Sequence, residues 1–144
     1  MPYRFLDDIA TADVAFEAWG NNVEDLFIAA AEASMNVMVD ELSGIEKIEH
    51  RRISLRAEAV DMLLFEFIQE LIFFKDAEQL LLRVSRIFIE KESSGLRLQA
   101  DLYGEVLDPI KHELNADVKA VTLHRFAVVQ IPGKGWNATV VLDI

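Results

Sequence analysis

Two aspartates near opposite ends of the sequence have the types and placement best suited to a chemical role. Asp13 interrupts the apolar alternation of residues 10–19, and Asp143 does the same in the segment that starts at Trp136. A carboxylate in an apolar strand is unfavourable unless it meets a partner or a cation. If the two segments meet, Asp13, Asp143 and the terminal carboxylate of Ile144 would suit Ca²⁺, Mg²⁺ or Mn²⁺, because hard cations prefer oxygen ligands. Spacing alone also fits a frayed acidic tail.

The remaining polar candidates are three histidines and a lysine. His50, His112 and His124 form no ligand pair that is local in sequence, and a lone strand histidine such as His50 is usually structural. His112 and His124 stay open as contacts to a partner or a phosphate. Lys119 is either a solvated strand lysine or a contact to a phosphate or carboxylate of the site.

Familiar enzyme signatures are missing from the sequence. It contains no glycine-rich phosphate loop after a strand, no His-Glu-x-x-His and no Gly-x-Ser-x-Gly elbow. The absence of cysteine excludes a thiolate metal site, a disulfide and a cysteine nucleophile. We therefore predict no catalytic residue of a free-standing enzyme.

Composition narrows the class of partner. The 144 residues carry a formal net charge of −11, which disfavours strong independent binding to nucleic acid and favours docking to a basic protein surface. The hydrophobic fraction of 52% suits a folded core. No apolar run reaches the roughly 18 residues of a membrane span, and no signal peptide is visible, so we expect a cytoplasmic protein without a membrane partner.

Hydrophobic periodicity indicates which elements position these residues. Strands are predicted at residues 10–19, within 45–57, and at 80–92, 96–103, 120–131 and 136–142. Helices are predicted at 23–39, with Asn21 or Asn22 as the cap, and at 59–75. A change of alternation near Ser85 predicts a β-bulge.

These elements predict one domain over residues 1–144 with an α+β fold. We expect a two-layer sandwich in which two helices pack on one face of a mixed or mainly antiparallel sheet. The second helix is apolar nearly all round, which is typical of burial between layers and also leaves a partner interface open. Residues 104–117 show no period, and such a segment in a compact domain is often functional.

Several short motifs resemble those of the archease family, the accessory proteins of the RtcB-type tRNA-splicing RNA ligase. The resemblance extends over essentially the whole chain, and the motifs that carry it are Phe5-Leu6-Asp7, Thr11-Ala12-Asp13-Val14, Tyr103-Gly104-Glu105, Asp108-Pro109, His112-Glu113, Val118-Lys119-Ala120-Val121-Thr122 with His124, Gly135-Trp136 and Asp143-Ile144. The Lys-Ala-Val-Thr segment followed by a final Asp-Ile is the most specific of them.

The resemblance implies a metal site at Asp13, Asp143 and Ile144, and an archease-like fold. It also implies an activator that promotes guanylylation of the ligase and its multiple turnover in tRNA splicing. That ligase joins an RNA 3′-phosphate or 2′,3′-cyclic phosphate to a 5′-hydroxyl through a guanylylated histidine of its own. An activator of this kind is not itself an enzyme, although it could contribute groups to the reaction.

The opening motif of this chain departs from the family pattern at one residue and in its spacing. The family usually reads Asp-His-Thr-Ala-Asp, whereas this chain has Ala10 at the histidine and a longer spacing back to Asp7. A function of that histidine cannot be served here by the same atom, while the metal aspartate is retained.

The alternatives to a ligase activator are a stand-alone metal-dependent phosphohydrolase and a chaperone-like interaction protein with a structural metal.

Overall fold

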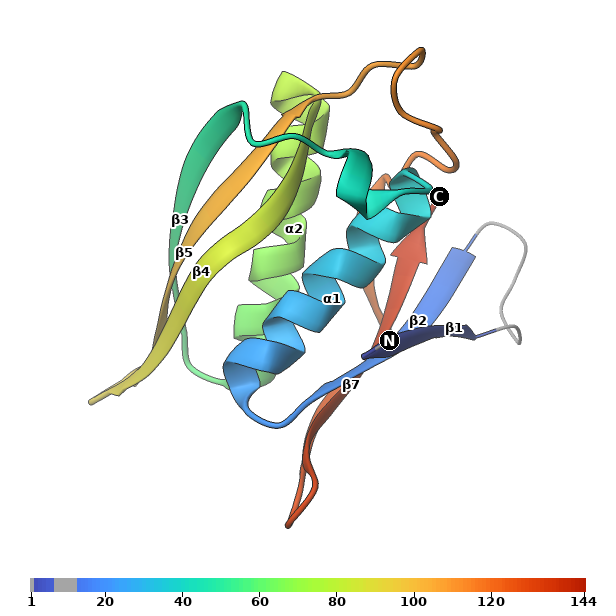
Figure 1. Ribbon diagram of the computed structural model, residues 1–144. Helices are drawn as coiled ribbons and strands as arrows, with labels where there is room; N and C mark the ends of the chain where they lie inside the picture. Colours follow the sequence, from blue (N-terminus) through green and yellow to red (C-terminus); the bar gives the residue numbers. More distant parts are fainter. Residues whose placement is uncertain (1, 7–12) are drawn as a thin grey trace.

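The computed structural model describes residues 2–6 and 13–144, drawn as a ribbon in Figure 1. The strands in this part are β1 (Tyr3–Leu6), β2 (Asp13–Gly20), β3 (Glu49–Ala57), β4 (Leu80–Glu92), β5 (Gly95–Val106), β6 (Ala120–Ile131) and β7 (Gly135–Asp143). The helices are α1 (Val23–Met38), α2 (Val60–Glu78) and a short 3-10 helix at Leu42–Gly44. Asp7, Ala10, Thr11 and Ala12 of the opening motif lie outside the described residues.

The strands form two antiparallel sheets, with the orders β1-β2-β7-β6 and β3-β5-β4. The predicted α+β class with two helices and antiparallel pairing is confirmed. The strands divide into two sheets where the sequence predicted one. Alternation of side chains defines the faces of a strand, but it does not say which strands pair.

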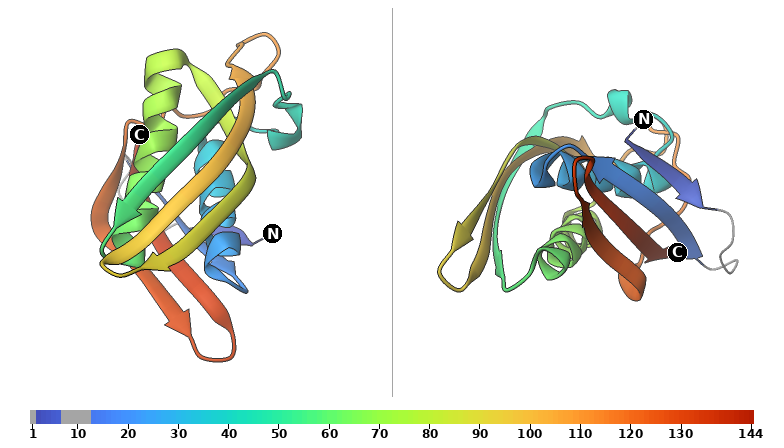
Figure 2. Two further views of the ribbon diagram at one scale, coloured as in Figure 1. Left: turned by 90° about the vertical axis from the view of Figure 1, so that its left-hand side faces the viewer. Right: turned by 90° about the horizontal axis from the view of Figure 1, so that it is seen from below.

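Both helices lie between the two sheets, as Figures 1 and 2 show. Helix α1 contacts β2 and β7 on one side and β4 on the other, and α2 contacts β6 as well as β3 and β4. Burial on two sides explains the wide apolar arc of α2, which hides Leu63, Leu64, Phe67, Ile68, Leu71 and Ile72. The prediction of burial between layers is confirmed, although Met62 and Phe73 on α2 stay exposed.

Some predicted features of the helices and strands are confirmed, and other predicted boundaries differ from those in the structure. Asn22 caps α1, since its Oδ1 accepts a 2.8 Å hydrogen bond from the backbone N–H of Asp25. The bulge of β4 falls between Val84 and Arg86. Helix α2 runs three residues further than predicted, to Glu78, and ends where Gln79 adopts a left-handed conformation. Strand β1 was not predicted, because four residues are too few to show an alternation.

The irregular segment begins later than predicted, because β5 continues to Val106. Residues 107–119 then pass over the C-terminal end of α1. The backbone N–H groups of Asn115 and Ala116 donate to the carbonyls of Met38 and Val37, which the helix leaves without partners. Among the described residues, no helix is long and apolar enough to cross a membrane.

Gly104 provides a test of how closely β4 and β5 approach. A Cβ added at Gly104 would collide with the backbone carbonyl of Leu81, whereas one at Gly44 meets nothing within 4 Å. We expect Gly104→Ala to lower the free energy of unfolding by roughly 1–3 kcal/mol, because backbone cannot move aside as a flexible side chain can. Gly44→Ala should change it by less than about 0.5 kcal/mol. Urea unfolding checks both, and equal effects of the two substitutions would contradict the close approach.

Candidate carboxylate site

The two predicted aspartates meet in the structure. Strand β2 begins at Asp13, β7 ends at Asp143, and the antiparallel register places these residues directly opposite each other. Directly opposed residues have Cβ atoms about 4.5–5.5 Å apart, and like charges at that spacing destabilise the pair. Both residues are partly exposed. The sheet therefore brings together two carboxylates from residues that are 130 positions apart in the sequence.

Asp143 is held on both sides. On the side away from β2, Ala120 of β6 lies opposite Asp143, and the backbone N–H of Lys119 donates a 2.8 Å hydrogen bond to the Asp143 carbonyl. Ile144 is partly buried and packs against the hydrophobic core. A segment paired with two strands and anchored by a packed side chain is not a frayed tail, so that interpretation is wrong.

The chemistry of the pair suits a hard cation. Within residues 2–6 and 13–144, Asp13 and Asp143 take part in no ion pair. The same part of the chain contains no group of three His, Cys, Asp or Glu side chains placed for a metal. A cation here would therefore use two side-chain carboxylates and complete its shell with other oxygen ligands, as Ca²⁺ and Mg²⁺ commonly do.

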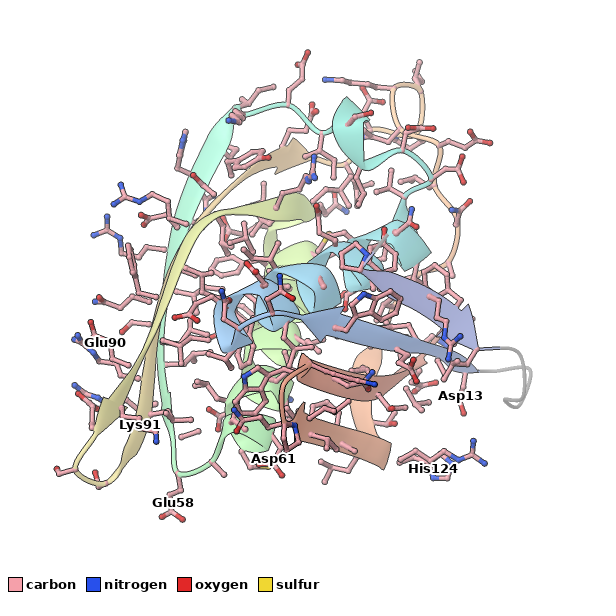
Figure 3. All side chains as sticks on the ribbon, turned by 60° about the horizontal axis from the view of Figure 1, so that its bottom comes forward. Asp13, Glu58, Asp61, Glu90, Lys91 and His124 are labelled. Carbon is pink, nitrogen blue, oxygen red and sulfur yellow. The ribbon has the colours of Figure 1, made fainter. Side chains whose placement is uncertain are left out.

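Two of the candidate contact residues, Lys119 and His124, lie just before β6 and within it. Lys119 directly precedes β6 and is exposed, and its backbone contacts Asp143. His124 is exposed within an irregular part of β6, where pairing with β7 is interrupted between Thr122 and Ala127. In Figure 3, His124 projects away from the sheet on the same side of the view as Asp13. Both candidates are available to an approaching partner.

His112 lies inside the molecule, with 4% of its surface exposed. Its Nδ1 accepts a 2.9 Å hydrogen bond from the backbone N–H of Asp108. Its Nε2 is 3.3 Å from Glu105 Oε2 without good hydrogen-bond alignment. The ring is part of the 107–119 segment, and its burial favours a role in holding the shape of that segment. A contact between His112 and a partner or phosphate stays a prediction.

Glu105 is the centre of that internal network. Its buried carboxylate accepts hydrogen bonds from the backbone N–H of Glu46 at 2.6 Å and from Lys111 Nζ at 2.8 and 2.9 Å. Burial raises the pKa of Glu105, but the hydrogen bonds from Lys111 and Glu46 outweigh it, so the pKa lies below its usual value. The ionised carboxylate thus ties the loop before β3 to the segment that leads toward Lys119.

Lys75 fixes the end of the same segment. Its buried ammonium donates to Asp117 Oδ1 at 2.6 Å and to the Val118 carbonyl at 2.7 Å. Burial lowers the pKa of Lys75, while the bonds to Asp117 and Asp76 raise it by more, so the group stays charged. Lys75 therefore clamps the chain one residue before Lys119.

Sequence reasoning missed Lys75 and Glu105 as residues that position the chain before Lys119. For Lys75 a signal existed, because it follows Leu71 by four residues on the buried stripe of α2. Glu105 stands in a recognised motif, but its role depends on a contact with Glu46, 59 residues away. Arg125 has a left-handed backbone with a φ of 55°, for which the sequence carries no local signal.

Comparison with known proteins gives a consistent result along nearly the whole chain. The model of the Archease protein family (MTH1598/TM1083) matches residues 3–144. The protein archease of Pyrococcus abyssi is 38% identical over 134 residues, which cover 93% of this chain and 94% of that relative.

Two solved structures are similar. The solution structure of protein 1598 of Methanobacterium thermoautotrophicum has a TM-score of 0.85 and 34% identity, and the match covers 99% of each chain. The crystal structure of an archease from Thermotoga maritima, described as a possible chaperone, has a TM-score of 0.61 over 98% of each chain. At 22% identity the second likeness shows the fold alone.

The Glu105 network predicts a pH dependence of stability. Because the pKa of Glu105 is lowered from 4.5 by folding, the unfolded chain binds more protons in that range. Its contribution is complete above about pH 4.5 and is lost as the pH falls through the lower folded pKa. We expect Glu105→Gln to be less stable than the wild type at pH 7 and the two unfolding curves to converge on acidification. Urea unfolding from pH 7 to 3 checks this, and a constant gap would contradict it.

Proposed function

The chain belongs to the archease family, and from that premise we propose that it activates an RtcB-type tRNA-splicing RNA ligase. It promotes guanylylation of the ligase and so supports multiple turnover. The observation that carries the proposal is the pairing of Asp13 with Asp143 at adjoining strand ends, with Lys119 bonded to the same backbone. The family match alone does not identify a reaction, whereas this pairing provides a charged site that a ligase could use.

Asp13, Asp143 and the carboxylate of Ile144 are the groups that would hold a divalent cation. The chemistry supplied there is partial neutralisation of a nucleotidyl phosphate during its transfer. Asp13 and Asp143 orient oxygen ligands from two paired strands, which are more rigid supports than a loop. Lys119 adds a positive charge beside them and can contact either a phosphate or one of the carboxylates.

Docking to the ligase is favoured by the overall charge. A net charge of −11 attracts the basic surface that an RNA-binding ligase presents, and it speeds the encounter of the two proteins. The reacting histidine belongs to the ligase, so this chain needs no nucleophile of its own. The proposal therefore agrees with the missing enzyme signatures in the sequence.

The first test removes one negative charge at a time from the pair. We expect Asp13→Asn and Asp143→Asn each to lower ligase activation by about tenfold or more, since a cation site loses a charged ligand. The measurement is multiple-turnover RNA ligation and ligase guanylylation with sub-stoichiometric amounts of this protein. Asp101→Asn is the matched control, because Asp101 pairs with Arg52 on the other sheet.

The same variants separate chemistry from folding. With a chelator present to remove metal, both variants should be at least as stable as the wild type, because the repulsion between the two opposed carboxylates is removed. Loss of folding in the chelator would make the pair structural and refute its assigned role. Phosphate release from nucleotides or RNA by this protein without a ligase would favour the phosphohydrolase alternative. Improved ligase solubility without faster guanylylation would favour the chaperone-like alternative.

The second test extends the chain beyond Ile144. Added residues convert the terminal carboxylate into a neutral amide and place bulk beside Asp143, so cation binding and ligase activation should both fall. An extension before Met1 should have a smaller effect. Calorimetric titration with Ca²⁺ or Mn²⁺, run beside the turnover assay, measures the two properties. Equal affinity and activation for free and extended termini would remove Ile144 from the ligand set.

A further inference from the structure

Strand β6 carries a long bulge that starts three residues after Ala120, the residue opposite Asp143. Thr122 pairs with Val141 and Ala127 with Thr139, so residues 123–126 lie opposite the single residue Val140. Within this bulge, Arg125 has a φ of 55°. A side chain other than glycine in this left-handed region costs about 1–2 kcal/mol, which Gly or Asn would reduce. The conformation of Arg125 is therefore maintained by the structure around it.

Both ends of the bulge are anchored. At its start, Thr122 Oγ1 donates a 3.0 Å hydrogen bond to the Val141 carbonyl. At its end, the Phe126 ring packs edge-on against Phe65 of α2, with ring centroids 5.5 Å apart. Leu123, His124 and Arg125 between these anchors are exposed. The bulge thus presents three side chains to the outside from fixed supports.

The stretch of sequence that contains the bulge has the opposite charge to the protein as a whole. Residues 118–142 contain no Asp or Glu, whereas 25 carboxylates spread evenly over 144 residues would place about four there. The stretch carries Lys119, Arg125 and Lys134, all of which are exposed. The carboxylates resume only at Asp143. Lys119 and Arg125 lie just before and within the strand that pairs with Asp143, whereas Lys134 lies in the turn at the far end of the hairpin.

The bulge is close enough to act with that pair. Ala120 lies opposite Asp143, and Leu123 follows it by three residues, which is about 10 Å along a strand. Arginine has one of the longest side chains, so Arg125 can serve the same bound group as the carboxylates. Figure 3 shows the neighbouring His124 projecting away from the sheet, on the same side of the view as Asp13.

We propose that Arg125 contacts the phosphate chain of the nucleoside triphosphate held by the ligase, with His124 beside it. The inference rests on the proposed function and adds a recognition residue to it. Two carboxylates repel a phosphate chain, so a site that takes one needs a permanent positive charge nearby. A guanidinium supplies that charge and binds phosphate oxygens in a two-pronged geometry. The left-handed backbone is held by the structure around it and restricts the directions open to the side chain, which lowers the cost of ordering it.

The test compares Arg125→Asn with Arg125→Lys in ligase guanylylation at varied GTP and varied amounts of this protein. Asn suits the left-handed backbone but removes the charge, so we expect the KM for GTP to rise about tenfold. Lys keeps the charge and loses the two-pronged contact, so a smaller rise is expected. The concentration of this protein that gives half-maximal activation should stay unchanged in both. Arg86→Asn is the matched control, because Arg86 adjoins the bulge of β4 on the other sheet.

Thermal unfolding tests whether Arg125 has a structural role instead. If it had one, Arg125→Asn would lower the melting temperature. Arg125→Asn should raise the melting temperature by about 2–4 °C, because backbone strain is relieved. A more stable protein with a higher KM for GTP cannot be explained by partial unfolding.

Two results would overturn the inference while leaving the proposed function intact. One is an unchanged KM for GTP in Arg125→Asn. The other is a higher half-maximal activating concentration at constant KM, which would assign Arg125 to the ligase surface instead of the nucleotide. If the folded wild type itself fails to stimulate guanylylation, the proposed function fails, and the inference fails with it.

Discussion

The register between β2 and β7 is the constraint on which the site depends. Phe16 lies opposite Val140 and Ala18 opposite Ala138, and all four side chains are buried in the core. A slip of one residue would turn every one of these side chains to the other face of the sheet. The burial of this apolar set therefore fixes the register, and the same register sets Asp13 against Asp143. Hydrophobic packing holds together two charges that would otherwise separate.

The loop from residue 107 to 119 is also held in place by buried groups, although it has no regular secondary structure. Glu105 and Lys75 are charged groups buried at its two ends, and each is matched by hydrogen bonds from or to the backbone. Buried charges are costly unless they are paired in this way, so removing one partner is expensive. These bonds fix the course of the chain immediately before Lys119. The position of a candidate contact residue is thus determined by groups that never reach the partner.

The net charge of the protein does not show how its charges are distributed along the chain. The net value of −11 predicts attraction between the protein as a whole and a basic partner. At the β6–β7 hairpin, however, the exposed residues Lys119 and Arg125 are positively charged and lie just before and within the strand that pairs with Asp143, and the segment from 118 to 142 has no carboxylate side chain. Long-range docking and local recognition of a phosphate can therefore use opposite signs on one small domain.

The sequence by itself determined both α-helices, the strands β2 to β7, most of their boundaries and the two aspartates of the site. Alternation and helical spacing are local properties, and the misfit of Asp13 and Asp143 in apolar strands is visible without a structure. Only the tertiary structure decided that the strands form two sheets around the helices, that Asp13 faces Asp143, and that His112 is buried. It also decided that Arg125 takes a left-handed conformation. These features depend on contacts between distant segments, and the free energy of such contacts is not encoded in any local pattern.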